Sequence, residues 1–366
     1  MRRPRLPRDT QELLHWYERY ISPLSLVAGF LADNYILLRR VDLWTSNLLL
    51  FSYLTICALG IVLINLIETG RLRTPWALKV APFIPVVVQF SFGGLFSGFL
   101  SLYSRSAAFA VSWVFVVLLA ALLIGNERFT RMYVRFSFQV SLYFTVLFSF
   151  LIFYLPVILR QIGPYIFLAS GGLALVGVTL FFLLLRFLVP ERAVPERTKV
   201  ARRVAVIFVV FNILYFTGAI PPLPLALKEA GVYHGIARAG DEYHLFYEPL
   251  PWYQQYLNYN TVFHRTENEP AYVYTAIFAP SGLSVTVFHE WQYWGDREGA
   301  WVTAETVPFY IVGGRDGGYR GYSVKSGLEP GSWRVNVITQ YGQTIGRVSF
   351  QVVDVPSPVA IQEVTR

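Results

Sequence analysis

The first 220 residues contain seven long runs of apolar residues, and these runs constrain the fold more than any other feature. A helix needs about 20 apolar residues to cross the hydrocarbon layer of a bilayer, which is about 30 Å thick. The qualifying runs are 22–38, 46–67, 80–102, 107–125, 134–158, 164–189 and 203–220. The first run carries Asp33 and Asn34, so six spans remain the alternative. We therefore predict an all-α membrane domain of seven transmembrane helices over 22–220, preceded by a cytosolic arm, 1–21.

The composition supports a membrane protein and locates its excess of basic residues. The chain has 366 residues, of which only 15% are charged, whereas soluble domains carry about 25%. Residues 1–222 hold 21 Lys and Arg against 9 Asp and Glu, and residues 223–366 hold 10 against 14. Basic residues that flank membrane spans explain this asymmetry better than a nucleic-acid-binding patch does. We predict membrane lipids as partners and no nucleic acid.

Alternate connections between the apolar runs collect the Lys and Arg residues. The N-terminal arm and the second, fourth and sixth connections hold 17 of them, whereas the other connections hold four. Because basic loops stay in the cytosol, the N-terminus is predicted to be cytosolic. Seven crossings then place the C-terminal half outside. We predict a bacterial inner (cytoplasmic) membrane protein with a periplasmic or extracellular C-terminal domain.

Beyond a Pro-rich linker, predicted at 221–230, the sequence pattern changes from apolar runs to alternation. Segments rich in β-branched and aromatic residues, separated by Gly and Pro turn signals, lie at 271–278, 283–294, 300–312, 319–326, 332–339 and 344–353. In the fifth segment Trp333 and Val335 alternate with Arg334 and Asn336, so one strand face is expected to be buried. We predict an all-β domain at 231–366, an immunoglobulin-like sandwich of two sheets. An open barrel is the competing fold.

The C-terminal pattern APSGLSVTVFHEW, followed by GGRDGGYRGYSVKSGLEPGSWRVNVITQYGQTIGRVSFQV, resembles the bacterial domain-of-unknown-function 2914 family. The membrane half is similar to the family in GFLADNYILLRRVD and FSFGGLFSGFLSLYSRS. The pattern positions are Pro280, Gly282, His289, Trp291, Gly314, Arg315, Arg320, Ser323, Lys325, Gly331, Trp333 and Gly342. The resemblance implies a multi-span membrane protein with a C-terminal β domain. It implies no activity, because the family has none assigned.

Three features that suggest catalysis lack the partners that the chemistry needs. HEWQY at 289–293 begins like a zinc-protease helix, but Tyr293 stands where the second His is required. His289 is therefore expected to pack or hydrogen-bond within a sheet. GGRDGGYR lacks the Gly-Lys-Ser/Thr of a phosphate loop, so a hairpin turn is predicted there. Cys57 is the single cysteine, which excludes an intrachain disulfide and a thiolate metal site. We predict a non-catalytic protein without cofactor or metal.

Two groups of residues are candidates for binding in the exported half. The aromatic segment 243–264 supplies Tyr247, Trp252, Tyr253, Tyr256 and Tyr259. Such residues stack on sugar rings or anchor partner proteins, and an interfacial aromatic belt or simple packing is the alternative. The second group is a cationic patch of Arg315, Arg320 and Lys325, for which a solvated sheet face is the alternative.

Polar residues inside the apolar runs are a third group of candidates, because such residues are costly in a membrane and are often functional. The group contains Asp33, Asn34, Gln89 and Arg105, with Asp33 expected to form a structural ion pair. Amide side chains expected to hydrogen-bond across helices are those of Asn65, Gln89, Gln139 and Asn212.

These patterns favour one function over another. The leading hypothesis is a non-catalytic membrane protein whose extracytoplasmic β domain binds a partner protein or an envelope polymer, as an accessory subunit of a larger complex. The alternative is a transporter or lipid-handling protein with its site among the helices near Asp33.

Overall fold

The structure, a computed structural model, describes residues 43–106, 109–126, 132, 135–222, 224–249, 261–266, 268–315 and 317–366. The predicted arm at 1–21 and the first predicted span, 22–38, lie outside these residues. The chain divides into two compact units. One is helical and ends at residue 219; the other begins at residue 220, holds all the strands, and includes the short segments 105–113 and 159–163.

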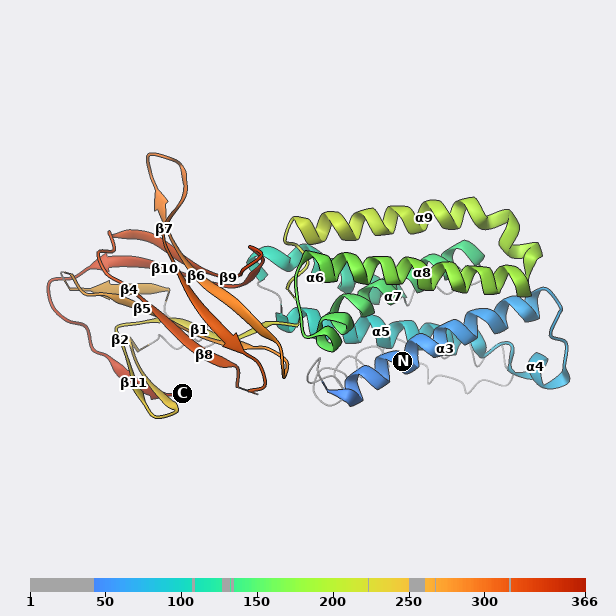
Figure 1. Ribbon diagram of the computed structural model, residues 1–366, viewed down its shortest axis with the longest axis horizontal. Helices are drawn as coiled ribbons and strands as arrows, with labels where there is room; N and C mark the ends of the chain where they lie inside the picture. Colours follow the sequence, from blue (N-terminus) through green and yellow to red (C-terminus); the bar gives the residue numbers. More distant parts are fainter. Residues whose placement is uncertain are drawn as a thin grey trace, which may run out of the picture. The chain divides into compact units, whose positions relative to one another are not determined.

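The described helices are α3 (Trp44–Glu68), α4 (Pro75–Val80), α5 (Ile84–Ser106), α6 (Phe109–Asn126), α7 (Phe136–Leu159), α8 (Pro164–Leu188) and α9 (Pro190–Phe216) (Figure 1). Four apolar segments are long enough to cross a membrane, namely Trp44–Glu68, Ile84–Tyr103, Phe136–Leu159 and Pro164–Leu188. The segment Trp113–Asn126 is apolar but shorter. Within the described residues, the chain is therefore a membrane-type helical protein, and the number of seven spans stays a prediction.

The basic connection after the sixth apolar run is helical, so the prediction of a loop there is wrong. Only Val189 separates α8 from α9, and α9 continues through 190–203 into the last predicted span. Pro190 occupies the first turn of α9, where a missing N–H costs nothing, and Glu191 in that turn complements the helix dipole. Charged residues end an apolar run but are good helix formers, which is why run counting missed this helix start.

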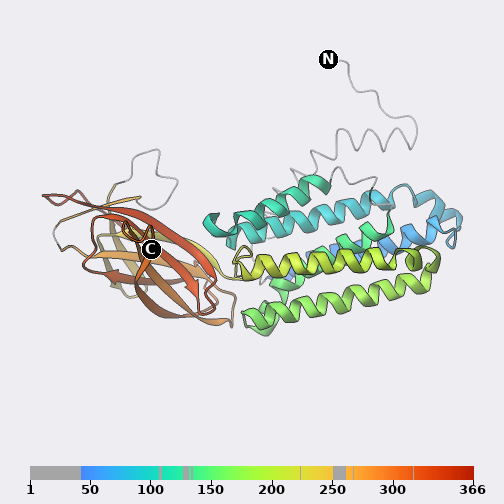
Figure 2. The ribbon, with the colours of Figure 1, turned by 90° about the horizontal axis from the view of Figure 1, so that it is seen from above.

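The helices pack through aromatic rings on α7, α8 and α9. The ring of Phe148 lies 5.7 Å from that of Phe167 and 4.8 Å from that of Phe211, measured between centroids. Phe167 in turn stacks on Tyr215 at 3.8 Å. Helices α8 and α9 run side by side as an antiparallel pair (Figures 1 and 2).

The strands of the second unit are β1 (Ala226–Tyr233), β2 (Gly235–Ala239), β3 (Glu242–Tyr247), β4 (Val262–Arg265), β5 (Ala271–Phe278), β6 (Ser284–Gly295), β7 (Ala300–Val312), β8 (Tyr319–Lys325), β9 (Gly331–Thr339), β10 (Thr344–Asp354) and β11 (Gln362–Thr365). The six segments predicted from alternation are confirmed as β5 to β10. Strand β1 begins at Ala226, inside the predicted linker 221–230, so that linker is shorter than predicted.

The strands form three sheets, ordered β1-β5-β8, β4-β10-β9-β6-β7 and β11-β3-β2. Strand β4 runs parallel to β10, and the other pairings are antiparallel. Val348 lies opposite Val335 and Phe350 opposite Trp333, so the apolar positions of β9 and β10 share one face. That face is buried, as the alternation predicted.

One hydrophobic cluster joins the first and second sheets. Its members are Val232, Phe263, Ala271, Val273, Trp291, Leu328, Trp333, Val335, Val348, Phe350 and Val352. The indole of Trp291 is fully buried and meets the ring of Phe350 edge-on at 6.3 Å. Packing of this kind stabilises the β-rich region in the absence of a disulfide.

The glycine-rich loop at 313–318 differs from its predicted role. It joins β7 of the five-stranded sheet to β8 of the β1-β5-β8 sheet, so it is a crossover between sheets and not a hairpin turn. Gly314 and Gly318 have φ values of 118° and 86°, which L-residues rarely adopt. A Cβ at Gly313 would collide with the main-chain oxygen of Pro280. The glycines therefore allow the chain to pass tightly from one sheet to the other.

Candidate functional site

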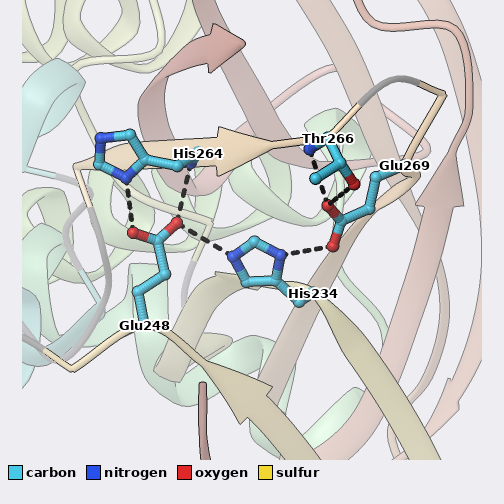
Figure 3. A network of polar contacts seen from close by, with 5 residues as sticks. All are labelled: His234, Glu248, His264, Thr266 and Glu269. Atoms are coloured by element: carbon cyan, nitrogen blue, oxygen red, sulfur yellow. Dashed lines mark hydrogen bonds and ion pairs between the residues drawn. The ribbon is translucent and has the colours of Figure 1, made fainter. Parts of the chain in front are cut away.

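Two histidines and two glutamates form a hydrogen-bonded network at the strand ends of the β-rich region (Figure 3). His234, between β1 and β2, places Nε2 3.0 Å from Glu248 and Nδ1 2.7 Å from Glu269. Glu248 also accepts the main-chain N–H of His264, at 2.8 Å, and lies 2.7 Å from its Nδ1. Glu269 accepts the N–H and the hydroxyl of Thr266, both at 3.0 Å. The network ties residues 35 positions apart into one unit.

Burial and charge act in opposite directions on this network. Burial alone lowers the pKa of His234, but the hydrogen bonds and charges of Glu248 and Glu269 outweigh it and raise this pKa above 6.5. Burial raises the pKa of both glutamates, but their hydrogen bonds, led by those with His234, bring it below 4.5. Both pKa shifts favour the same ion-paired state, a protonated His234 between two carboxylates.

The arrangement is suited to holding the fold together and not to metal binding. Both ring nitrogens of His234 already face carboxylates, so neither is directed to a shared centre. In the described part of the chain, no group of three or more His, Cys, Asp or Glu residues is placed to hold a metal ion. In the sequence, Glu248 and His264 flank the aromatic-rich segment 250–260, which lies outside the described residues.

His289 lies in a second network, inside the core between β5, β6 and β8. Its Nε2 is 2.9 Å from the Thr275 hydroxyl, and its Nδ1 is 2.8 Å from the Ser323 hydroxyl. Trp291 donates its indole N–H to the same Ser323 oxygen at 3.0 Å. Burial lowers the pKa of His289 to about 3, so the ring is neutral. His289 is hydrogen-bonded, as predicted, but its partners belong to the β1-β5-β8 sheet and not to its own sheet.

A third polar array lies on the face of the five-stranded sheet that points away from the core. Asn336 of β9 is opposite Glu290 on one side and Arg347 on the other, and Arg334 is opposite Gln292. Arg334 Nε donates to Gln292 at 2.7 Å, and Arg347 Nε donates to the Asn336 oxygen at 2.6 Å. The Asn336 amide bridges the two halves, donating to Gln292 at 3.1 Å and to Glu290 at 2.9 Å.

The array carries two guanidinium groups and one carboxylate. Neither Arg334 nor Arg347 forms an ion pair within the described residues, and none of their unpaired nitrogens is buried. Burial lowers the pKa of both, and repulsion by Arg347 lowers that of Arg334 further, against the opposing charge of Glu290. The array therefore offers fixed donors and net positive charge to an acidic group.

Two tryptophans lie beside the array, Trp294 on β6 and Trp301 on β7. The guanidinium of Arg334 lies 4.2 Å from the ring centroid of Trp301, a cation–π contact that fixes its plane. Trp294, opposite Trp301, meets it edge-on at 5.5 Å and is 41% exposed. The sequence does not indicate this site, because alternation alone predicts that Arg334 and Asn336 lie on the solvent-exposed face of a strand and does not show which side chains lie beside them.

The structure separates the three residues of the predicted cationic patch. Arg320 donates to the main-chain oxygen of Asp241 at 3.1 Å, and Arg315 lies 4.0 Å from its carboxylate. Lys325, five residues along β8 and so about 17 Å away, pairs with Glu305 at 2.9 Å. The structure thus brings Arg315 and Arg320 together but leaves Lys325 apart, and each group already has a partner.

Of the residues in the predicted aromatic site, the structure describes Tyr247. Tyr247 ends β3 and donates its hydroxyl to Gln362 of β11 at 3.3 Å. The other aromatic candidates, Trp252, Tyr253, Tyr256 and Tyr259, lie outside the described residues. They stay a prediction.

Among the intramembrane candidates, Gln89 is buried and exchanges amide-to-carbonyl bonds with Asn126, at 3.2 and 3.0 Å. Asn65 donates to Gln139 at 2.7 Å, which confirms the predicted bond across helices, whereas Asn212 bonds its own helix. Asp33 and Asn34 lie outside the described residues, as does the side chain of Arg105.

The fold thus defines a class, a protein with membrane-type helices followed by a β-rich region. Residues 284–352, from β6 to β10, match the model of a family described as "Protein of unknown function (DUF2914)". This is the family that the sequence pattern resembles, and the match confirms the resemblance for that region. It includes His289, Trp291 and the outer-face array.

Comparisons with curated proteins and with solved structures do not point to a function. No curated protein matches the chain. Among solved structures, the alkylpurine DNA glycosylase AlkC of Pseudomonas fluorescens, bound to DNA containing an abasic site analog, aligns over 86% of this chain and 99% of its own, with 11% identity. The TM-score of that alignment is 0.19, so it carries no argument about fold or function.

Proposed function

We propose that this protein is a non-catalytic membrane protein whose β-rich region binds an acidic partner protein or envelope polymer. The observation that carries the proposal is the outer-face array. Arg334 and Arg347 are held by the amides of Gln292 and Asn336, and neither forms an ion pair in the described residues, although the charge of Glu290 acts on both. Fixed guanidinium groups recognise carboxylate and phosphate through paired N–H donors.

The proposal also includes a sandwich fold for the β-rich region, seven membrane spans and the side of the membrane on which each part lies. The clusters shared by the β1-β5-β8 sheet and the five-stranded sheet support an immunoglobulin-like sandwich. The concentration of Lys and Arg in alternate connections supports seven spans, a cytosolic N-terminus and an extracytoplasmic β domain in a bacterial inner membrane. A sandwich held outside by a helical anchor suits an accessory subunit of a larger complex.

The binding role is tested by crosslinking in cells. Thr306 lies opposite Glu290 on the outer face and is exposed, so a photo-crosslinking amino acid at this position reaches a ligand on the array. We expect a light-dependent adduct of defined size, and its sensitivity to protease distinguishes a protein from a polymer. The adduct should be lost when Arg334→Gln and Arg347→Gln are combined.

The same probe at Arg238 of β2, which is exposed and belongs to the β11-β3-β2 sheet, is the positional control. Equal adducts from Thr306 and Arg238, or none from Thr306, would overturn the role of the outer face. Sidedness is tested separately by reporters fused after Arg366. A reporter active only after export should be active, and activity of a cytosolic reporter instead would contradict the topology.

A further inference from the structure

The antiparallel pair α8 and α9 brings arginine side chains beside an apolar helix. At one end of the pair Phe167 stacks on Tyr215, and at the other end only Val189 separates the helices. Toward the Val189 end, Arg197 of α9 lines the same groove as Phe182 of α8. Cations of α9 therefore lie level with the second half of α8.

That half of α8 is suited to lipid and not to water. Its large exposed side chains are Leu180, Leu183, Leu184 and Phe187, between 47% and 81% exposed. The helix, with 25 residues, is about 37 Å long, so about 7 Å of it exceeds a hydrocarbon layer of about 30 Å. Val178, which lines a groove with Ala201 and Val204, lies about 15 Å from the end of α8. Residues 201–204 of α9 therefore lie level with the apolar second half of α8.

The basic half of α9 has more cations than its neighbours neutralise. Residues 190–203 include five basic and two acidic residues. Arg192 and Lys199 each pair with a glutamate. Arg197, Arg202 and Arg203 have no ion pair or hydrogen bond within the described residues, although the charge of Arg203 acts on nearby Glu196. Unneutralised guanidinium groups beside a surface that contacts lipid chains are costly.

Two open grooves contain these three arginines, one on each side of α9. The groove against α7, about 400 Å³, is lined by Met132, Phe138, Ser141, Leu142, Thr145, Arg202, Arg203, Val206 and Ile207. The groove against α8, about 450 Å³, is lined by Val178, Thr179, Phe182, Arg197, Thr198, Val200, Ala201 and Val204. Each combines guanidinium and hydroxyl groups with an apolar wall.

We propose that these grooves bind anionic phospholipids. The lipid phosphate lies on Arg202 and Arg203 in one groove and on Arg197 in the other, and the acyl chains follow the apolar walls. A lipid fits better than a soluble anion, because the cations lie beside exposed apolar helix surface and because the walls of the grooves are mostly apolar. Basic pockets between membrane helices are a general means of holding such headgroups. The inference rests on the helical unit and not on the proposed binding role of the β region.

The test is native mass spectrometry of the full-length protein, delipidated in mild detergent and titrated with phosphatidylglycerol or phosphatidylcholine of identical acyl chains. We expect bound phosphatidylglycerol, preferred about tenfold over phosphatidylcholine, since a charge-assisted hydrogen bond has this order of effect. Combined Arg202→Gln and Arg203→Gln should remove the preference at one of the two grooves, so that fewer phosphatidylglycerol molecules bind preferentially, while the Arg197 groove keeps its lipid. Equal binding of the two lipids would overturn the proposal.

Arg186 is the matched control, because it lies in the last turn of α8 and lines neither groove. Arg186→Gln should leave the preference unchanged, and an equal loss there would show general surface attraction. If the double glutamine variant does not fold, Arg202→Lys with Arg203→Lys should keep the preference, because lysine also binds phosphate. Loss in the lysine variant, or binding of glycerol 3-phosphate as tight as that of the lipid, would also refute the proposal.

Discussion

The Nδ1 atom of His234 lies 2.7 Å from a carboxylate oxygen of Glu269, while the other nitrogen of the same ring faces Glu248. The two carboxylates favour the protonated form of the imidazole, because they raise its pKa. The contact with Glu269 joins the end of β1 to the residues just before β5, the strand that pairs with β1. The side chain of His234 is only 6% exposed, so solvent screens these contacts weakly.

His234→Asn should change how the stability of the β region depends on pH. Because the folded pKa of His234 is raised, its stabilisation is complete below about pH 6.5 and is lost as pH rises through the folded value. The lowered pKa values of Glu248 and Glu269 give stabilisation above about pH 4.3 that is lost as pH falls. We expect the variant to lose about 1.5 kcal/mol near pH 5.5 and less at pH 8.5, measured by thermal unfolding followed by tryptophan fluorescence.

His244→Asn is the control for that experiment. His244 also meets a glutamate, Glu363, at 2.5 Å, but the pair is 29% and 50% exposed. The expected change is below about 0.5 kcal/mol. A pH profile for His234→Asn parallel to that of the wild type would contradict the role of the network.

His289→Phe should show the opposite pH dependence. Its pKa of about 3 in the fold means that stabilisation is present above about pH 6.5 and is lost as pH falls. The phenyl ring cannot form hydrogen bonds, so Thr275 and Ser323 lose their imidazole partner, which should cost about 2–3 kcal/mol at pH 8. The difference from the wild type should shrink by about 2 kcal/mol at pH 5, because there the unfolded histidine is protonated. A difference that grows in acid would refute the buried neutral state.

Asn336→Ala should destabilise the β region by about 2 kcal/mol. The side chain is 6% exposed and links Glu290, Gln292 and Arg347, so its loss leaves partly buried polar groups unpaired. Denaturant unfolding measures the effect. Ser349→Ala, an exposed change opposite Arg334, should stay within about 0.5 kcal/mol; an equal cost at both positions would mean that the array is not a coupled unit.

Asn65 and Gln139 should be coupled across α3 and α7. A double-mutant cycle with Asn65→Ala and Gln139→Ala is expected to give about 0.6–1.7 kcal/mol of coupling, typical of hydrogen bonds between membrane helices. Unfolding in mixed micelles supplies the four stabilities. Asn212→Ala, whose side chain bonds Phe208 of its own helix, should show no coupling to Gln139→Ala.

Gly313→Ala should destabilise the crossover between β7 and β8. The new methyl group would collide with the Pro280 carbonyl oxygen, a main-chain atom that cannot rotate away. The expected cost is about 2 kcal/mol, measured as a decrease of the melting temperature. At Gly317 a Cβ would meet only the Arg320 side chain, at 3.9 Å, so Gly317→Ala should be nearly neutral. A similar decrease at Gly317 would show that the cost at Gly313 does not come from the collision with Pro280.

Local periodicity predicted the strands in which apolar side chains face the core and polar side chains face away from it. Val335 and Val337 face the core and Arg334 faces away, so β9 could be predicted from alternation alone. The start of α9 could not, because helix formation at 190–203 depends on packing against α8 and not on an apolar run. The predicted hairpin at 313–318 was wrong for a similar reason: turn residues show that the chain turns but not which strand the next one joins.

The sequence by itself determined the type of each half, because apolar run length and side-chain alternation act over neighbouring residues and need no distant partner. Only the tertiary structure decided the sites. His234 and Glu269 are 35 residues apart, and Arg334 reaches Gln292 from 42 residues away. Such pairs form because strand order and register bring distant residues together, and no local pattern records which strands become neighbours.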